Sequence, residues 1–160
     1  MLKNFPLFQN LTQFIDRPKT QSEDPAIDIW AYAEPAGEEP DPLKRNVLQW
    51  RRILTSVRDP IAEFAGQQVN VIGFVHRPSL TPPSQFVLAR QIIRCCLADT
   101  VPLGLSIHTE SASAYANDTW LRVQGQFITV AVRNHSALVI HPVSIEVIEH
   151  PQKAYINGVF

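Results

Sequence analysis

Cysteine is scarce in this chain of 160 residues: there are two, and they are neighbours, Cys95 and Cys96. Adjacent cysteines rarely bridge each other, so a disulfide scaffold is excluded and a reducing compartment is expected. No run approaches the roughly 20 apolar residues that span a bilayer, and the first residues do not continue into the apolar stretch of a secretory signal. We therefore expect a cytoplasmic protein with no transmembrane segment of its own, for which a partner is one route to a membrane.

The chain also lacks an excess of charge of either sign, with 14 basic and 15 acidic side chains. The net charge is −1, which argues against strong nonspecific binding to nucleic acid. The chain contains no G-x-S-x-G elbow, phosphate-binding loop or dinucleotide fingerprint. We therefore expect that the protein is not an enzyme. A thiol enzyme, in which His76 or His108 activates Cys95 or Cys96, is the remaining catalytic alternative.

What the chain does contain is enough apolar material for a core, with 45% hydrophobic and 18% charged residues. The charge is distributed unevenly. Residues 1–42 carry three basic and eight acidic side chains, a net of −5, whereas residues 43–160 carry eleven and seven, a net of +4. This contrast predicts two parts: a segment 1–42, with an apolar helix and an acidic proline-rich linker, and a folded domain 43–160.

Within the first part, apolar residues at three- and four-residue spacing predict a short helix. They are Phe5, Leu7, Phe8, Leu11, Phe14 and Ile15. This stripe could pack on the domain, on a partner or on a membrane surface, and packing onto protein is favoured because few basic residues accompany it. Five prolines between residues 18 and 42 predict a linker. Residues 27–32 alternate like a strand and could dock on the domain.

Apolar side chains again follow helical spacing from residue 43 to 58, which predicts an amphipathic helix ended by Asp59-Pro60. We expect its basic residues on an outer, solvated surface and Trp50 as a packing anchor. The basic residues are Lys44, Arg45, Arg51, Arg52 and Arg58.

After Gly66 the pattern alternates, which predicts strands near 69–75, 86–96, 103–108, 120–132 and 137–148, the last broken at Pro142. A short helical insert is expected at 111–116. This order predicts a mainly β fold, a five-stranded OB-fold-like barrel preceded by the helix, with a sandwich as the alternative. Gly73 and Gly125 fit the bends of such a barrel, and Trp120 is expected to plug one end of it.

Three blocks of the sequence also resemble a known family. They are Gly73-Phe74-Val75, then Ala89-Arg90 followed by Cys95-Cys96-Leu97-Ala98-Asp99, and then Trp120-Leu121-Arg122-Val123-Gln124-Gly125. In this order, within residues 66–149, they resemble the C-terminal domain of the DUF1980 permease-subunit proteins. The resemblance implies an accessory domain beside a membrane permease, with metal homeostasis as the suspected context. Members of that family carry two transmembrane helices before this domain, and here the apolar stripe and acidic linker stand in their place.

The cysteine pair is the sharpest chemical feature. A soft metal such as zinc would draw on Cys95, Cys96 and Asp99 if the backbone bends after the strand, together with His76 or His108 from neighbouring strand ends. The spacing lacks the paired C-x₂-C pattern, so the alternative is one buried and one surface cysteine. For Asp99, the favoured role is an ion pair with Arg90 or Arg94.

Three functions follow from these patterns. The leading interpretation is a noncatalytic accessory domain that binds a permease or another protein. The second is a metal-binding domain built on the Cys-Cys-x-x-Asp block. The third is an OB-type binder of single-stranded nucleic acid, for which the sequence shows few aromatic platforms and no strong basic groove.

Overall fold

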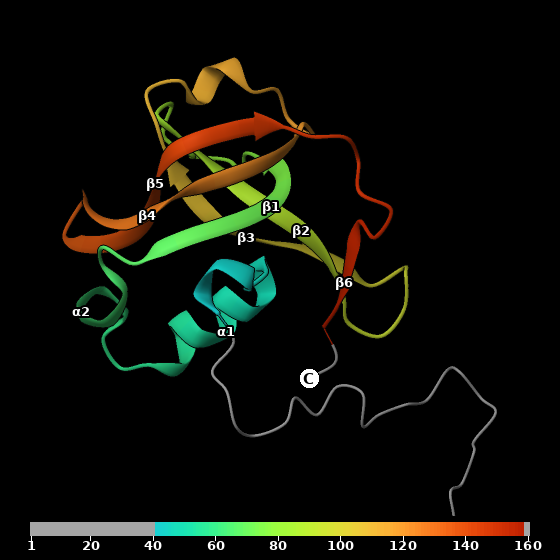
Figure 1. The fold of residues 1–160 in the computed structure, drawn as a ribbon, viewed down its shortest axis with the longest axis horizontal. Helices are drawn as coiled ribbons and strands as arrows, with labels where there is room; N and C mark the ends of the chain where they lie inside the picture. Colours follow the sequence, from blue (N-terminus) through green and yellow to red (C-terminus); the bar gives the residue numbers. More distant parts are fainter. Residues whose placement is uncertain (1–40, 159–160) are drawn as a thin grey trace, which may run out of the picture. The chain divides into compact units, whose positions relative to one another are not determined.

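The computed structural model describes residues 41–158 (Figure 1). The predictions for the apolar stripe, for the acidic linker and for residues 27–32 lie outside these residues. None of the helices in the described part combines the length and the apolar character that crossing a bilayer requires.

The predicted helix over 43–58 is shorter in the structure and is followed by a second one. A 3-10 turn, η2 (Pro42–Lys44), comes first, and α1 (Val47–Ser56) follows. The side chain of Asn46 accepts from the Gln49 amide while the Gln49 side chain accepts from the Asn46 amide, a capping box that sets the start of α1. Asp59 does not end α1. It caps α2 (Pro60–Phe64), where Pro60 occupies the first turn that tolerates proline.

The strands appear in the expected order. They are β1 (Gln68–His76), β2 (Gln85–Ile93), β3 (Thr100–His108), β4 (Trp120–Val132), β5 (His135–Val147) and the short β6 (Tyr155–Asn157), with a 3-10 turn, η3 (Ala112–Ala114), between β3 and β4. Two boundaries differ from the prediction. β2 ends at Ile93, so the cysteines are not part of it, and β5 continues through Pro142 because a register shift opposite Gln124 and Gly125 accommodates the missing donor.

Five of the strands close into a barrel. The order is β1-β4-β5-β3-β2, and a further antiparallel pairing between β1 and β2 completes the ring. All these pairs are antiparallel except β3–β5, which is parallel through Ile107 and Ile140. This order is the OB topology, so the predicted barrel is confirmed and the sandwich alternative is wrong. β6 pairs in parallel with residues 91–93 of β2, beyond the three residues that β2 pairs with β1 (Figure 1).

The core runs between the barrel and α1, which packs against β1, β2 and β3 below the strands in Figure 1. Trp50 of α1 is fully buried and meets the rings of Phe64 and Phe127 edge-on at centroid distances of 6.1 and 5.1 Å. Arg45 was expected on the outer surface, but it is 2% exposed and its guanidinium lies 4.9 Å from the Trp50 ring centroid. Helix α1 therefore supplies the largest fully buried side chain of the described residues, Trp50. Trp120 is only half-buried and lies outside the core cluster.

Candidate functional site

The cysteine block forms the tip of a hairpin. We call residues 94–99, which join β2 to β3, the thiol loop. Its ends are tied by the Arg94 amide donating to the Asp99 carbonyl at 3.2 Å, and a turn brings the Asp99 amide to the Cys96 carbonyl at 2.9 Å. Both cysteines are exposed free thiols. The prediction that one is buried in a strand is therefore wrong, because pairing stops at Ile93–Thr100.

The two sulfurs lie on the same side of this loop. The Sγ atoms of Cys95 and Cys96 are 3.8 Å apart, and the Cys95 thiol donates to Oδ2 of Asp99 at 3.4 Å. The hydrogen bond to Cys96 contributes most, and the hydrogen bond to Asp99 contributes next, to raising the pKa of the Cys95 thiol above its ordinary value. The bend expected after the strand thus brings Cys95, Cys96 and Asp99 together, with Cys95 held as a thiol.

The two histidines of the predicted metal set lie elsewhere. His76 is opposite Val87 and His108 is opposite Gln85, at the start of β2, whereas the thiol loop follows its end. Eight strand steps separate Gln85 from Ile93, about 26 Å at the rise of an extended chain. Among residues 41–158, no group of three or more His, Cys, Asp or Glu side chains is arranged to hold a metal ion. The predicted five-residue site is therefore not assembled.

Arg90 does not pair with Asp99 as expected. Its guanidinium donates to the carbonyls of Ala154 at 3.2 Å and Lys153 at 2.6 Å, and it lies 5.4 Å from the ring centroid of Trp120. Arg90 is 6% exposed, and burial lowers its pKa below the ordinary value. Its role in the structure is to hold the segment that leads into β6 against β2.

Gly73 and Gly125 lie where two strand backbones approach closely. A Cβ at Gly125 would overlap the carbonyl oxygen of His141, and one at Gly73 would stand 2.6 Å from the carbonyl oxygen of Ala89. Both obstacles are backbone atoms, which cannot rotate aside. These glycines permit the crossings that close the barrel.

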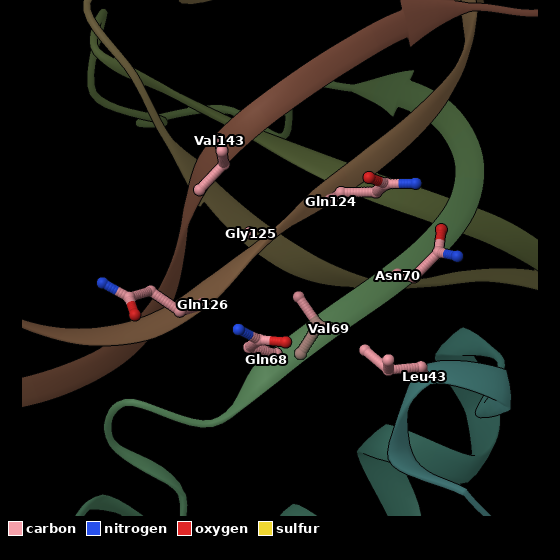
Figure 2. A pocket seen from close by; sticks show the side chains of 8 residues that line it. All are labelled: Leu43, Gln68, Val69, Asn70, Gln124, Gly125, Gln126 and Val143. Carbon is pink, nitrogen blue, oxygen red and sulfur yellow. The ribbon is translucent and has the colours of Figure 1, made fainter.

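The residues labelled in Figure 2 line a hollow at β1 and β4, which we call the amide hollow. Its volume is about 280 Å³. Its polar side chains form two cross-strand pairs, Gln68 opposite Gln126 and Asn70 opposite Gln124. It is also lined by Leu43, Val69, Gly125 and Val143. Carboxamides both donate and accept hydrogen bonds without charge, so this surface suits a neutral polar group.

A second hollow of about 250 Å³, the aromatic hollow, lies where the ends of β1 and β4 meet the C-terminal segment. Its walls include Phe74, Gln91, Asp118, Trp120, His150 and Tyr155. Trp120 meets Phe74 and His150 edge-on at centroid distances of 5.7 and 5.2 Å. Trp120 therefore borders a surface hollow and does not plug the barrel.

Sequence reasoning overlooked both hollows. Alternation places Gln68 and Asn70 on one face of β1, and Gln124 and Gln126 on one face of β4. Their pairing depends on the register between the two strands, which the sequence does not show. The aromatic hollow had no such signal, because Gln91 and Tyr155 meet only through the pairing of β2 with β6.

The fold and its surfaces define the class of this protein: a small closed barrel of OB topology, with a leading helix packed against it. Comparison with known proteins then places it in a family. The profile of the DUF1980 C-terminal domain matches residues 36–157, and the chain belongs to this family. No curated protein matches the chain.

Two solved structures are similar to this chain. One is the OBody AM2EP06 bound to hen egg-white lysozyme, at 9% identity and a TM-score of 0.34, covering 54% of this chain and 83% of that one. The other is the N-terminal domain of the PriB protein from Thermoanaerobacter tencongensis, at 16% identity and a TM-score of 0.32, covering 51% of this chain and 96% of that one.

Proposed function

We propose that this chain is a noncatalytic accessory domain that works in the cytoplasm and binds a permease-type membrane protein, in the context of metal homeostasis. Membership of the DUF1980 C-terminal domain family supports the permease as the partner. The observation that carries the proposal is the thiol loop, which presents four successive uncharged residues, Cys95 to Ala98, at the end of a hairpin.

The apolar character of this tip is unusual for a solvated hairpin end. Leu97 is 70% exposed, and Val101 on the adjoining strand is 38% exposed. Hairpin loops are ordinarily rich in polar and turn-forming residues. An exposed group of thiol and apolar side chains is better accounted for by burial against a partner.

Co-purification tests the proposal. The tagged full-length chain, expressed in its own host, should recover a permease-type protein from detergent-solubilised membranes, and Leu97→Asp should abolish the recovery. Leu80→Asp is the matched control, because Leu80 is 94% exposed in the β1–β2 loop, at the other end of β2, and its φ of 72° suits Asp. A chain that recovers no membrane protein and remains monomeric would show that the proposal is wrong.

A second function, binding of a thiophilic metal ion such as zinc, is favoured by the sulfur geometry. In a tetrahedral zinc site with Zn–S bonds of about 2.3 Å, two thiolate sulfurs stand about 3.8 Å apart. The Sγ atoms of Cys95 and Cys96 are 3.8 Å apart. The thiol loop supplies part of a coordination sphere that a partner or solvent would complete.

Elemental analysis distinguishes this second function from simple docking. Protein purified without chelator and then dialysed against zinc should retain metal, and the double variant Cys95→Ser/Cys96→Ser should not. Since metal binding displaces the thiol protons, retention should increase as the pH rises. Equal metal content in the two proteins would remove this candidate without affecting the docking proposal, for which Leu97 is the test.

A third function, binding of single-stranded nucleic acid, would need a basic groove, and neither of the two hollows is lined by a lysine or arginine side chain. The amide hollow is uncharged, and the aromatic hollow contains a carboxylate, Asp118.

A further inference from the structure

The aromatic hollow contains a polar group that the fold leaves without a partner. Oε1 of Gln91 is buried, and no hydrogen-bond donor within residues 41–158 reaches it. A buried acceptor that makes no hydrogen bond costs stability, by the desolvation of the group. Because Gln91 lines the hollow, a molecule bound there could supply the missing N–H donor.

A second acceptor stands in the same wall. Asp118 has a φ of 65°, and its amide donates to the Val75 carbonyl at 2.9 Å. This hydrogen bond fixes the backbone of Asp118 in the turn before β4. Its carboxylate accepts hydrogen bonds only. Gln91 Oε1 without a partner and the Asp118 carboxylate together favour a ligand that carries N–H groups. The negative charge of Asp118 disfavours a phosphate group next to it.

The third feature of the hollow is an aromatic wall. Edge-on contacts with Phe74 and His150 hold the Trp120 ring in place, and Tyr155 stands half-exposed at the rim. The guanidinium of Arg90 already lies 5.4 Å from the Trp120 ring centroid. A second cation at this ring would be repelled by the first, whereas a neutral, electron-rich ring can stack on it.

We infer that the aromatic hollow is a binding site for a neutral, flat heterocycle that carries N–H donors, of the purine class. Gln91 and Asp118 accept from its ring-edge N–H groups, and Trp120 and Tyr155 provide stacking surfaces. Its volume of about 250 Å³ lies below the range of pockets for drug-sized ligands, and it suits one ring system. Because Asp118 disfavours a neighbouring phosphate, the favoured ligand is a free base or nucleoside, and a base within a single strand is the alternative that the test distinguishes.

The test is a titration of the isotope-labelled full-length chain with adenosine, with guanosine and with choline, followed by NMR through the indole N–H signal of Trp120. Either nucleoside should shift this signal saturably in the millimolar range, and choline should not. Short single-stranded oligonucleotides form a separate arm: tighter binding than by the nucleoside, weakened by salt, identifies a strand as the source, and equal or weaker binding identifies the free base or nucleoside.

Two variants test the assigned contacts. Gln91→Met and Asp118→Asn should each weaken nucleoside binding about tenfold or more, since each removes an acceptor. Gln126→Met, in the amide hollow, is the control and should leave binding unchanged. Because Gln91→Met removes a buried unpartnered oxygen, its thermal stability should equal or exceed that of the wild type, which separates lost binding from lost folding.

Three results would overturn the inference. They are the absence of a saturable shift of the Trp120 signal with both nucleosides, a saturable shift with choline, and nucleoside binding that neither Gln91→Met nor Asp118→Asn weakens.

Discussion

Replacing Trp50 with alanine tests how α1 is joined to the barrel. Trp50 is fully buried, and its two edge-on ring contacts, with Phe64 and Phe127, connect α1 to α2 and to β4. Truncation of a buried Trp costs about 3–5 kcal/mol, against a total stability of about 5–15 kcal/mol for ordinary domains. The Trp50→Ala protein should therefore keep only part of its stability.

Trp50→Phe provides a graded comparison. Phenylalanine retains most of the apolar contact, and it removes an indole N–H that has no hydrogen-bond partner within the described residues. Loss of an unsatisfied donor offsets part of the lost packing, so we expect Trp50→Phe to cost less than about 2 kcal/mol.

Urea denaturation followed by circular dichroism measures both values. Arg51→Ala, at the exposed neighbour on α1, is the control and should stay within about 0.5 kcal/mol of the wild type. If Trp50→Ala unfolds within about 1 kcal/mol of the wild type, α1 does not complete the core, and the packing described above is wrong.

Three further predictions follow from the contacts. Gly125→Ala should destabilise the domain by about 1–3 kcal/mol or more in urea, since its Cβ meets backbone of β5, and an unchanged midpoint would contradict this. Arg90→Met should cost about 2 kcal/mol or more and speed hydrogen exchange at the β6 amides, whereas unchanged exchange would show that β6 is held by its strand pairing alone. Hydrogen bonds to Cys96 and Asp99 raise the pKa of Cys95, so Asp99→Asn should lower that pKa and move the pH profile of Cys95 alkylation to lower pH; a profile that does not move would refute the assigned cause.

The positions of the strands could be predicted because, in a barrel, alternate residues of a strand face the core. Val69, Val71 and Val75 alternate with outward residues in the sequence and are buried in the structure. The parallel pairing of β3 with β5 was not visible in the sequence, but the number and order of the strands, with an insert after the third, already favoured the OB topology.

The cysteine block shows where local reasoning failed. Ile92, Ile93, Cys95 and Cys96 are all apolar enough to extend a strand, so the sequence pattern did not reveal where β2 stops. The end of β2 depends on its partner: Ile93 pairs with Thr100, and the hairpin turns in the six residues between them. The same register places His76 and His108 near the other end of β2, away from the thiols.

By itself, the sequence determined the kind of elements this protein has, because side-chain periodicity and proline positions act on each segment locally. Only the tertiary structure decided which residues meet. Arg90 binds carbonyls some sixty positions away instead of the nearby Asp99, and Gln91 meets Tyr155 through β6. Such meetings depend on strand register and chain closure, and these are properties of the whole barrel that no local pattern carries.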